Sequence, residues 1–136
     1  MPMRSKKGFT LVELLLVVII IGALAAMIVP RLTGRSEQAK VAIAKTDVTS
    51  NIPLALDLYE LDNGKYPSSL QALITNPGGL KSWNGPYIKK TAIDPWGNPY
   101  RYRYPSTHGI DFDLYSLGPD GVEGNDDVTN WETESP

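Results

Sequence analysis

Hydrophobic positions are concentrated at the start of the chain. Residues 9–29 form a nearly unbroken apolar run of about 21 residues, and Glu13 is its one charged side chain. At about 1.5 Å of rise per residue, a helix of this length reaches across the hydrocarbon core of a bilayer. Pro30 follows the run and either kinks or ends a helix. The pattern therefore predicts a membrane-spanning helix over residues 9–30 and a separate polar domain over residues 31–136.

A second hydrophobic pattern covers Ser36 to Asn63 and predicts an amphipathic helix that continues the first one. Its apolar residues recur every three or four positions, as on one helical face: Val41, Ala44, Val48, Ile52, Leu56 and Tyr59. Asn63-Gly64 is a typical helix end, because glycine accepts the left-handed conformation there. Pro53 lies inside this helix, so we expect a kink or a break near residues 49–53 unless packing absorbs it.

The rest of the chain predicts short elements. A short helix is expected over residues 68–74, followed by a turn-rich stretch. Two strands follow, at Pro99–Tyr104 and Ile110–Leu114, where apolar and charged residues alternate. Paired antiparallel, they would place Arg101 and Arg103 opposite Asp111 and Asp113. The fold class is therefore α+β, with a long N-terminal helix packed on a small antiparallel sheet.

Composition argues against several kinds of function. The net charge is −2, and the basic-aromatic run at residues 100–104 is already explained as a strand, so nucleic acid is not an expected partner. The chain has no cysteine, and His108, its one histidine, is interpreted as a turn residue. Without a nucleophile-base pair or a phosphate-binding glycine loop, we expect no enzyme activity.

Charges near the apolar run set its expected orientation. Arg4, Lys6 and Lys7 precede it, and cations of this kind stay on the cytoplasmic side, which sends the C-terminal domain outward. The small residues 22–26 leave a cleaved signal peptide open as an alternative. Glu13 costs about 2.5 kcal/mol or more inside a membrane unless it is paired. It either has a partner or reaches the water at the headgroups.

Acidic residues are concentrated at the C-terminal end. From Asp111 onward there are eight Asp or Glu residues and no Lys or Arg. Residues 116–127 combine carboxylates with Gly118, Gly121 and Gly124, which let a loop wrap around an ion. Calcium takes about six to eight oxygen ligands in flexible geometry and fits better than magnesium or zinc. The spacing is not that of an EF-hand, and a solvated turn is the alternative.

The N-terminal motif, Lys6 to Glu13, closely resembles the processing site of the type IV pilin superfamily. The resemblance implies that a prepilin peptidase cuts between Gly8 and Phe9, removes residues 1–8 as a leader and methylates the new N-terminus at Phe9. It also implies that the helix continues through Pro30. Glu13 would become the fifth mature residue and would pair with the Phe9 ammonium of a neighbouring subunit during assembly.

Three further motifs resemble the major pseudopilins of type II secretion: residues 58–67, 94–100 and 116–121. This resemblance covers nearly the whole chain and implies a pilin-like fold with a calcium-binding C-terminal loop. The implied ligands are the side chains of Asp120, Asp126 and Asp127, the backbone oxygens of Leu117 and Val122, and Ser116 as a further ligand.

The same resemblance implies a function. The subunit would span the inner membrane once, with its domain in the periplasm, and polymerise with itself into a pseudopilus that helps to push folded proteins across the outer membrane. Minor pseudopilins and an inner-membrane assembly platform would be its partners. Two alternatives are a type IV pilus-type pilin and a membrane-anchored calcium-binding module that does not polymerise.

Overall fold

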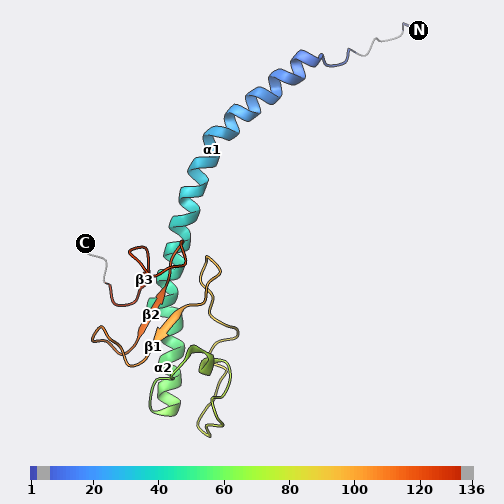
Figure 1. The fold of residues 1–136 in the computed structure, drawn as a ribbon. Coiled ribbons are helices and arrows are strands. Elements are labelled where there is room, and N and C mark those ends of the chain that lie inside the picture. Colours follow the sequence, from blue (N-terminus) through green and yellow to red (C-terminus); the bar gives the residue numbers. More distant parts are fainter. Residues whose placement is uncertain (3–6, 133–136) are drawn as a thin grey trace. The chain divides into compact units, whose positions relative to one another are not determined.

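The computed structural model describes residues 1–2 and 7–132, with the backbone alone for residues 29–33. Its elements in chain order are α1 (Leu11–Thr46), the π-helical segment η1 (Asp47–Asn51), α2 (Ile52–Asn63), the 3-10 helix η2 (Leu70–Leu73), β1 (Arg101–Arg103), β2 (Asp113–Ser116) and β3 (Val128–Thr129) (Figure 1). The chain divides into two compact units, Met1–Gln38 and Ala39–Pro136. Each unit is described by itself below.

The first unit is built on the apolar part of α1. Residues Leu11–Ile28 form a helix with a mean hydropathy of 2.9, long and apolar enough to cross a membrane, and none of it is buried within the protein. The backbone remains helical through Pro30, as expected. The hydrophobic run therefore makes a helix whose apolar surface needs lipid or another protein to cover it.

The second unit contains the amphipathic helix. Ala44, Val48, Ile52, Leu56 and Tyr59 are all buried, which confirms the predicted helical face. Val41 differs, because it is 43% exposed and lies close to the start of this unit. The apolar spacing thus identified the face of the helix that packs on the domain.

A π-helical segment interrupts the helix just before Pro53. The η1 turn spans Asp47–Asn51, and Pro53 follows in the first turn of α2, where its missing N–H costs little. Three side chains bond back within this stretch: Thr46 Oγ1 to Ala42 O at 2.9 Å, Thr49 Oγ1 to Lys45 O at 2.6 Å, and Asn51 Nδ2 to Asp47 Oδ1 at 2.7 Å. A kink or a break was expected near residues 49–53, but the chain stays helical through Asn63 and the helix instead contains a widened turn. At the far end, Gly64 closes α2 with a left-handed φ of 80°, also as predicted.

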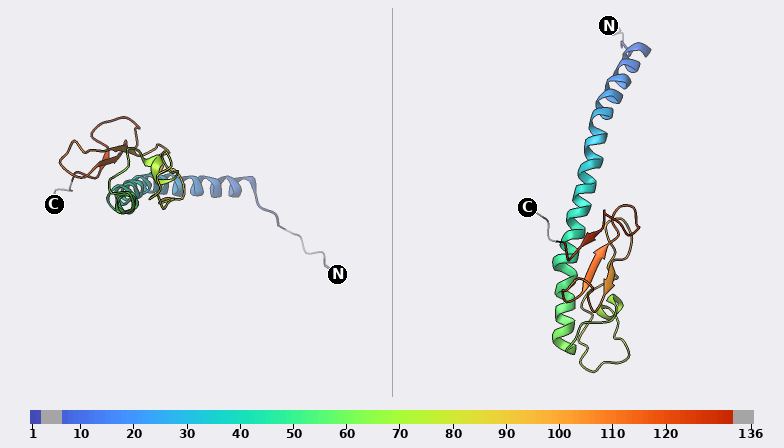
Figure 2. Two further views of the ribbon diagram at one scale, coloured as in Figure 1. Left: turned by 90° about the horizontal axis from the view of Figure 1, so that it is seen from below. Right: turned by 60° about the vertical axis from the view of Figure 1, so that its left-hand side comes forward.

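The sheet is antiparallel, in the order β1-β2-β3, and lies alongside the helix (Figure 2). Arg103 is opposite Asp113, as predicted, but Arg101 is opposite Tyr115. The predicted strand Ile110–Leu114 was wrong in its bounds, because β2 begins at Asp113 and continues to Ser116 with every residue buried. Asp111 lies outside the strand. The strand was predicted from alternating apolar and charged residues, but β2 is buried on both faces and its residues do not need to alternate.

Two further differences concern short elements. β3, with only two residues, was not predicted, and the helix expected over residues 68–74 is reduced to η2. Trp83 holds this region by donating from Nε1 to Ala72 O at 2.8 Å. The core between helix and sheet includes Leu56, Leu73 and Leu114, all fully buried.

Candidate functional site

The predicted processing site lies directly before α1. Phe9 is 94% exposed, and Gly8 and Lys7 are also exposed. The peptide bond between Gly8 and Phe9 is therefore accessible to a protease. Arg4 and Lys6, the other two cations expected to set orientation, lie outside the described residues.

Glu13 has a local role that the sequence reasoning missed. Thr10 N donates to Glu13 Oε2 at 2.8 Å, and Glu13 N donates to Thr10 Oγ1 at 3.2 Å. This reciprocal pair is a capping box, and its signature Thr-x-x-Glu was readable in the sequence. One carboxylate oxygen of Glu13 therefore caps α1 within the subunit, while Oε1 takes no part in these two bonds.

The acidic loop is closed by the sheet. Ser116, the last residue of β2, is the register partner of Val128, the first residue of β3, so residues 117–127 connect two paired strands. Asp120, Asp126 and Asp127 all lie in this loop, with Leu117 and Val122. The structure thus brings the predicted ligands other than Ser116 into one hairpin connection.

Several hydrogen bonds inside the loop go from backbone N–H groups to the predicted carboxylate ligands. Val122 N donates to Asp120 Oδ1 at 2.9 Å, and Gly124 N donates to Asp127 Oδ1 at 3.2 Å. Within residues 1–2 and 7–132, no three acidic or histidine side chains converge closely enough to hold a metal. Each oxygen that accepts one N–H keeps another lone pair, so these carboxylates offer the oxygen ligands that hard cations take, but among the described residues they do not surround one point.

Electrostatics favours a positive charge in this loop. Burial raises the pKa of Asp127, and repulsion from Asp126, Glu123 and Asp120 raises it further, against a lowering by the Gly124 N–H. A carboxyl group with a raised pKa is held in an environment that disfavours its charge. A divalent cation would relieve this repulsion, so the residues present fit calcium in charge and in ligand type.

Ser116 is occupied differently from the other predicted ligands. Its hydroxyl donates to Asp94 Oδ2 at 2.6 Å and accepts from Gly118 N at 3.1 Å. Ser116 is fully buried, whereas Val122 is 63% exposed. The structure therefore connects Ser116 to the segment before β1.

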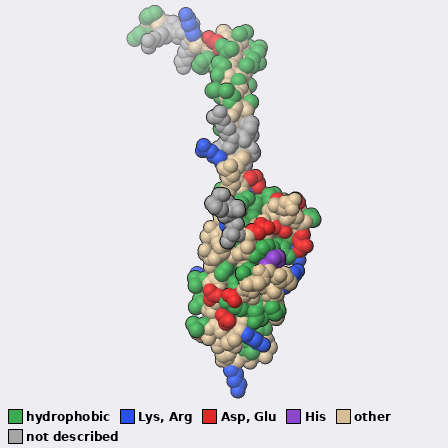
Figure 3. Space-filling model, turned by 90° about the vertical axis from the view of Figure 1, so that its left-hand side faces the viewer, with side chains coloured by type: hydrophobic (Ala, Val, Ile, Leu, Met, Phe, Trp, Pro, Cys, Tyr) green, Lys and Arg blue, Asp and Glu red, His purple; other side chains and the backbone are tan. Residues whose placement is uncertain are grey.

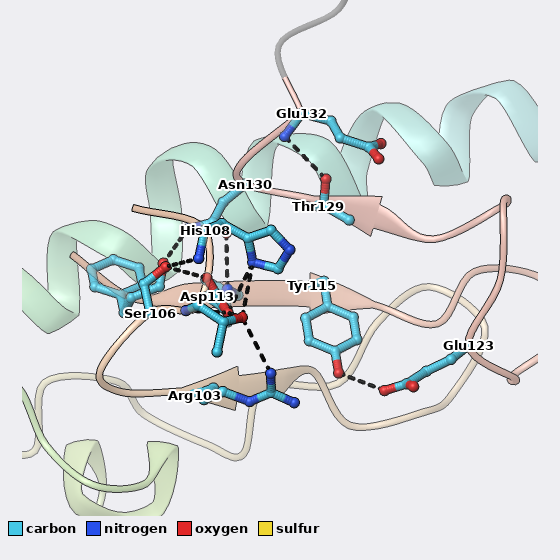
Figure 4. A network of polar contacts seen from close by, with 12 residues as sticks. Arg103, Ser106, His108, Asp113, Tyr115, Glu123, Thr129, Asn130 and Glu132 are labelled. Carbon is cyan, nitrogen blue, oxygen red and sulfur yellow. Dashed lines mark hydrogen bonds and ion pairs between the residues drawn. The ribbon is translucent and has the colours of Figure 1, made fainter. Parts of the chain in front are cut away.

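A second polar cluster, also missed from the sequence, adjoins the loop (Figure 4). The Asp113 carboxylate accepts from Ser106 Oγ at 2.5 Å and from Thr107 N at 3.1 Å, and it pairs with His108 Nδ1 at 3.0 Å. Burial alone would raise the pKa of Asp113, but the bonds from Ser106, Thr107 and His108 outweigh it and hold that pKa well below its usual range. His108 lies in a turn, as interpreted, and its ring stacks on Trp131 at 4.0 Å.

This cluster and the acidic loop share a cavity of about 210 Å³, lined in part by His108, Glu123 and Asp127. Acidic side chains gather beside the histidine on this face of the molecule (Figure 3). Residues 129–132 are held by Lys45, whose Nζ donates to Thr129 O at 3.0 Å and to Glu132 O at 2.9 Å. Contacts from the helix and the sheet therefore fix residues 128–132.

Comparison with protein families gives two matches. Residues 31–131 match the family model of the type II secretion system, protein G. Residues 3–29 match the prokaryotic N-terminal methylation motif. The two matches together cover nearly the whole chain and divide it where the apolar run ends.

Individual relatives match over most of their length. The type II secretion system core protein G of Pseudomonas aeruginosa is 51% identical, over 97% of this chain and 99% of the relative. That of Vibrio cholerae is 42% identical, over 97% of this chain and 96% of the relative. The crystal structure of the major pseudopilin from the type 2 secretion system of enterohaemorrhagic Escherichia coli matches with a TM-score of 0.64 at 33% identity, covering 77% of this chain and 95% of that one.

Proposed function

Because the chain belongs to the type II secretion system protein G family, it is a structural subunit of the secretion pseudopilus, and we propose that its N-terminal helix serves both as inner-membrane anchor and as filament core. The role is structural and not enzymatic. The observation that carries the proposal is the exposed apolar helix Leu11–Ile28, which begins with a charged residue in its first turn.

The topology proposed is a single pass. Lys7 and the cations before it stay on the cytoplasmic side, and residues 31–136 form the periplasmic domain. The methylation motif over residues 3–29 supports processing by a prepilin peptidase. In the proposal the peptidase cuts between Gly8 and Phe9, the leader 1–8 is removed, and Phe9 becomes the N-methylated first residue.

Glu13 then fixes the register between subunits. Removal of the leader creates an ammonium at Phe9, and a buried carboxylate is stabilised when a cation pairs with it. The capping bond uses Glu13 Oε2, which leaves Oε1 for the Phe9 ammonium of a neighbouring copy. One residue would thus both cap its own helix and join the next subunit.

The acidic loop completes the subunit. We assign calcium to it as a structural ion, held by Asp120, Asp126 and Asp127 with the backbone oxygens of Leu117 and Val122. The ion supplies positive charge that neutralises the clustered carboxylates and links the two ends of a loop that no disulfide closes. The filament, together with minor pseudopilins and the inner-membrane assembly platform, would help to push folded proteins across the outer membrane.

Substitutions at Glu13 test the assembly step. Glu13→Gln keeps an oxygen that can accept the capping bond from Thr10 N but removes the charge, whereas Glu13→Ala removes both. We expect wild-type membranes to yield filaments by electron microscopy and subunit ladders by crosslinking. In both variants the amounts of filament and of crosslinked ladder should fall by at least about tenfold, because losing about 1.4 kcal/mol per contact weakens association tenfold.

The two variants separate the possible results. Filaments in Glu13→Gln but not in Glu13→Ala would show that helix capping is sufficient and would refute pairing with the ammonium. Processed monomers in every sample, wild type included, would instead favour an anchored module that does not polymerise. Immunoblotting for the shortened chain confirms in each case that the peptidase has acted.

A further inference from the structure

Asp94 is a buried carboxylate that the proposed function leaves unused. It is 4% exposed and lies in the segment before β1. Its Oδ1 accepts from Trp96 N at 3.1 Å and from Asn98 N at 2.8 Å, while Asp94 N donates to Asn98 O at 2.8 Å. These bonds close a tight turn over residues 94–98 and use only one oxygen of the carboxylate.

The second oxygen of Asp94 reaches a different part of the chain. Ser116 Oγ donates to Asp94 Oδ2 at 2.6 Å, and Ser116 is fully buried at the end of β2. The same hydroxyl oxygen accepts from Gly118 N at 3.1 Å. Ser116 therefore transmits the position of Asp94 to the first turn of the acidic loop.

Gly118 passes this constraint to the far end of the loop. Its φ is +70°, and a Cβ placed on it would lie 2.4 Å from the backbone oxygen of Asp126. Glycine has no Cβ, so it alone can adopt this positive φ and let the backbone of Asp126 come this close. Hydrogen bonds thus link Asp94 to Ser116 and Ser116 to Gly118, and Gly118 lies close against the backbone of Asp126, a proposed ligand.

The same turn also lies close to the middle of the loop. Gly121 also has a φ of +70°, and a Cβ on it would lie 3.3 Å from Asn98 Nδ2. The 94–98 turn is therefore linked to the loop through Ser116 at Gly118, and the Asn98 side chain occupies the space beside Gly121.

From these contacts we infer that Asp94 is a positioning residue for calcium: acting through Ser116, it holds the loop 117–127 in the form that binds the ion. The inference rests on the calcium site of the proposed function. It also gives Ser116 a linking role in place of the ligand role suggested by family resemblance. Residues that orient metal ligands without touching the metal typically change affinity by about 10- to 100-fold when substituted.

Calcium titration of the full-length chain in detergent micelles, by isothermal calorimetry, tests the inference. Asp94→Asn keeps the shape of the side chain but takes away the oxygen that accepts from the Ser116 hydroxyl, and Ser116→Ala removes the hydroxyl itself. We expect each variant to weaken calcium binding by about 10-fold or more. Asp111→Asn, which removes an exposed carboxylate outside β2, is the matched charge control and should stay within about threefold of wild type.

The double variant distinguishes a linking role from a ligand role. If Ser116 acts through Asp94, then Ser116→Ala should cost little more once Asp94→Asn is present, because both changes break the same link. If Ser116 binds calcium directly, its substitution should weaken binding equally in both backgrounds. That result, or wild-type affinity in Asp94→Asn, would overturn the inference.

Hydrogen exchange without calcium separates this inference from the calcium proposal. In calcium-free buffer, Asp94→Asn should speed exchange of the amides of Gly118, Val122 and Gly124 relative to Asp111→Asn, with unchanged protection in α2. A wild type that binds no calcium would refute the calcium site, yet this exchange difference would still support positioning of the loop by Asp94. Equal exchange in the two variants would refute the positioning role whatever calcium does.

Discussion

Asp113 shows how a single residue can carry a charge inside this domain. The residue is 1% exposed, and donors from Ser106, Thr107 and His108 surround its carboxylate. Hydrogen bonds to a charged group each contribute about 1.5–3 kcal/mol, and a buried charge without them is costly. These bonds fix the turn after β1, where the ring of His108 meets Trp131.

The Asp113→Asn variant should lose part of this stabilisation. At pH 7 we expect its free energy of unfolding to fall by about 2 kcal/mol, because an amide cannot accept all of these bonds. The pKa of Asp113 is lowered in the folded state, so its contribution is present above its unfolded pKa of about 3.9 and is lost as the pH falls toward the folded value. The gap between wild type and variant should therefore narrow below about pH 4.

Denaturant unfolding followed by circular dichroism at pH 7, 5 and 3 measures that gap. Asp111→Asn, on the same hairpin but exposed, should remain within about 0.5 kcal/mol of wild type. A gap that stays constant down to pH 3 would mean that the effect of Asp113 comes from packing and not from its charge.

At the scale of single residues, the sequence identified the residues with special chemistry better than it identified their hydrogen-bond partners. The acidic loop, Glu13 and the turn at His108 were identifiable, because charge inside an apolar run and acid beside glycine are local signals. The partners of Asp113 and Asp94 were not, because Ser116 is 22 positions from Asp94 and only folding brings the two together. Such contacts leave no periodicity in the sequence.

Helix ends, at the scale of elements, depend on single backbone positions. Gly64 ends α2 with φ 80°, and its N–H donates to Glu60 O. A Cβ there would meet nothing within 4 Å, so a substitution acts through backbone strain and not through a clash. A substitution at Gly64 therefore measures the free-energy cost of placing a side chain on a left-handed backbone, without any clash.

Gly64→Ala should lower the free energy of unfolding by about 1–2 kcal/mol. Gly64→Asn is the matched comparison and should lose less, because asparagine tolerates the left-handed region. Chemical unfolding of both full-length variants measures the difference. Equal losses in the two variants would show that the strain argument is wrong at this position.

The helices were more predictable than the strands. Residues 44–59 repeat at the spacing of a helix, and Pro53 and Gly64 mark a disturbance and an end whatever the rest of the chain does. The π turn itself was not predicted, and its first residue, Asp47, accepts from Tyr100 OH at 2.6 Å, a contact between residues 53 positions apart. β2 is buried throughout and β3 has two residues, so neither shows the alternation that identifies a strand.

For the molecule as a whole, the acidic loop should couple the stability of the subunit to calcium. Binding to the folded state alone stabilises it by about 2.7 kcal/mol at a free concentration 100 times the Kd. We expect the thermal midpoint of the full-length chain to rise with calcium and to fall again with chelator. Magnesium, which demands a stricter octahedral geometry, should raise it much less.

Asp127 allows a test of this coupling, because calcium should reverse which of wild type and Asp127→Asn is more stable. Because its pKa is raised by burial and by Asp126, Glu123 and Asp120, its charge destabilises the ion-free folded state above the unfolded pKa. Asp127→Asn removes that charge, so without calcium the variant should be at least as stable as wild type. In saturating calcium the order should reverse, since the variant has lost a ligand and gains less from the ion. A variant less stable than wild type by the same amount in both buffers would show that Asp127 acts only through its bond from Gly124 N.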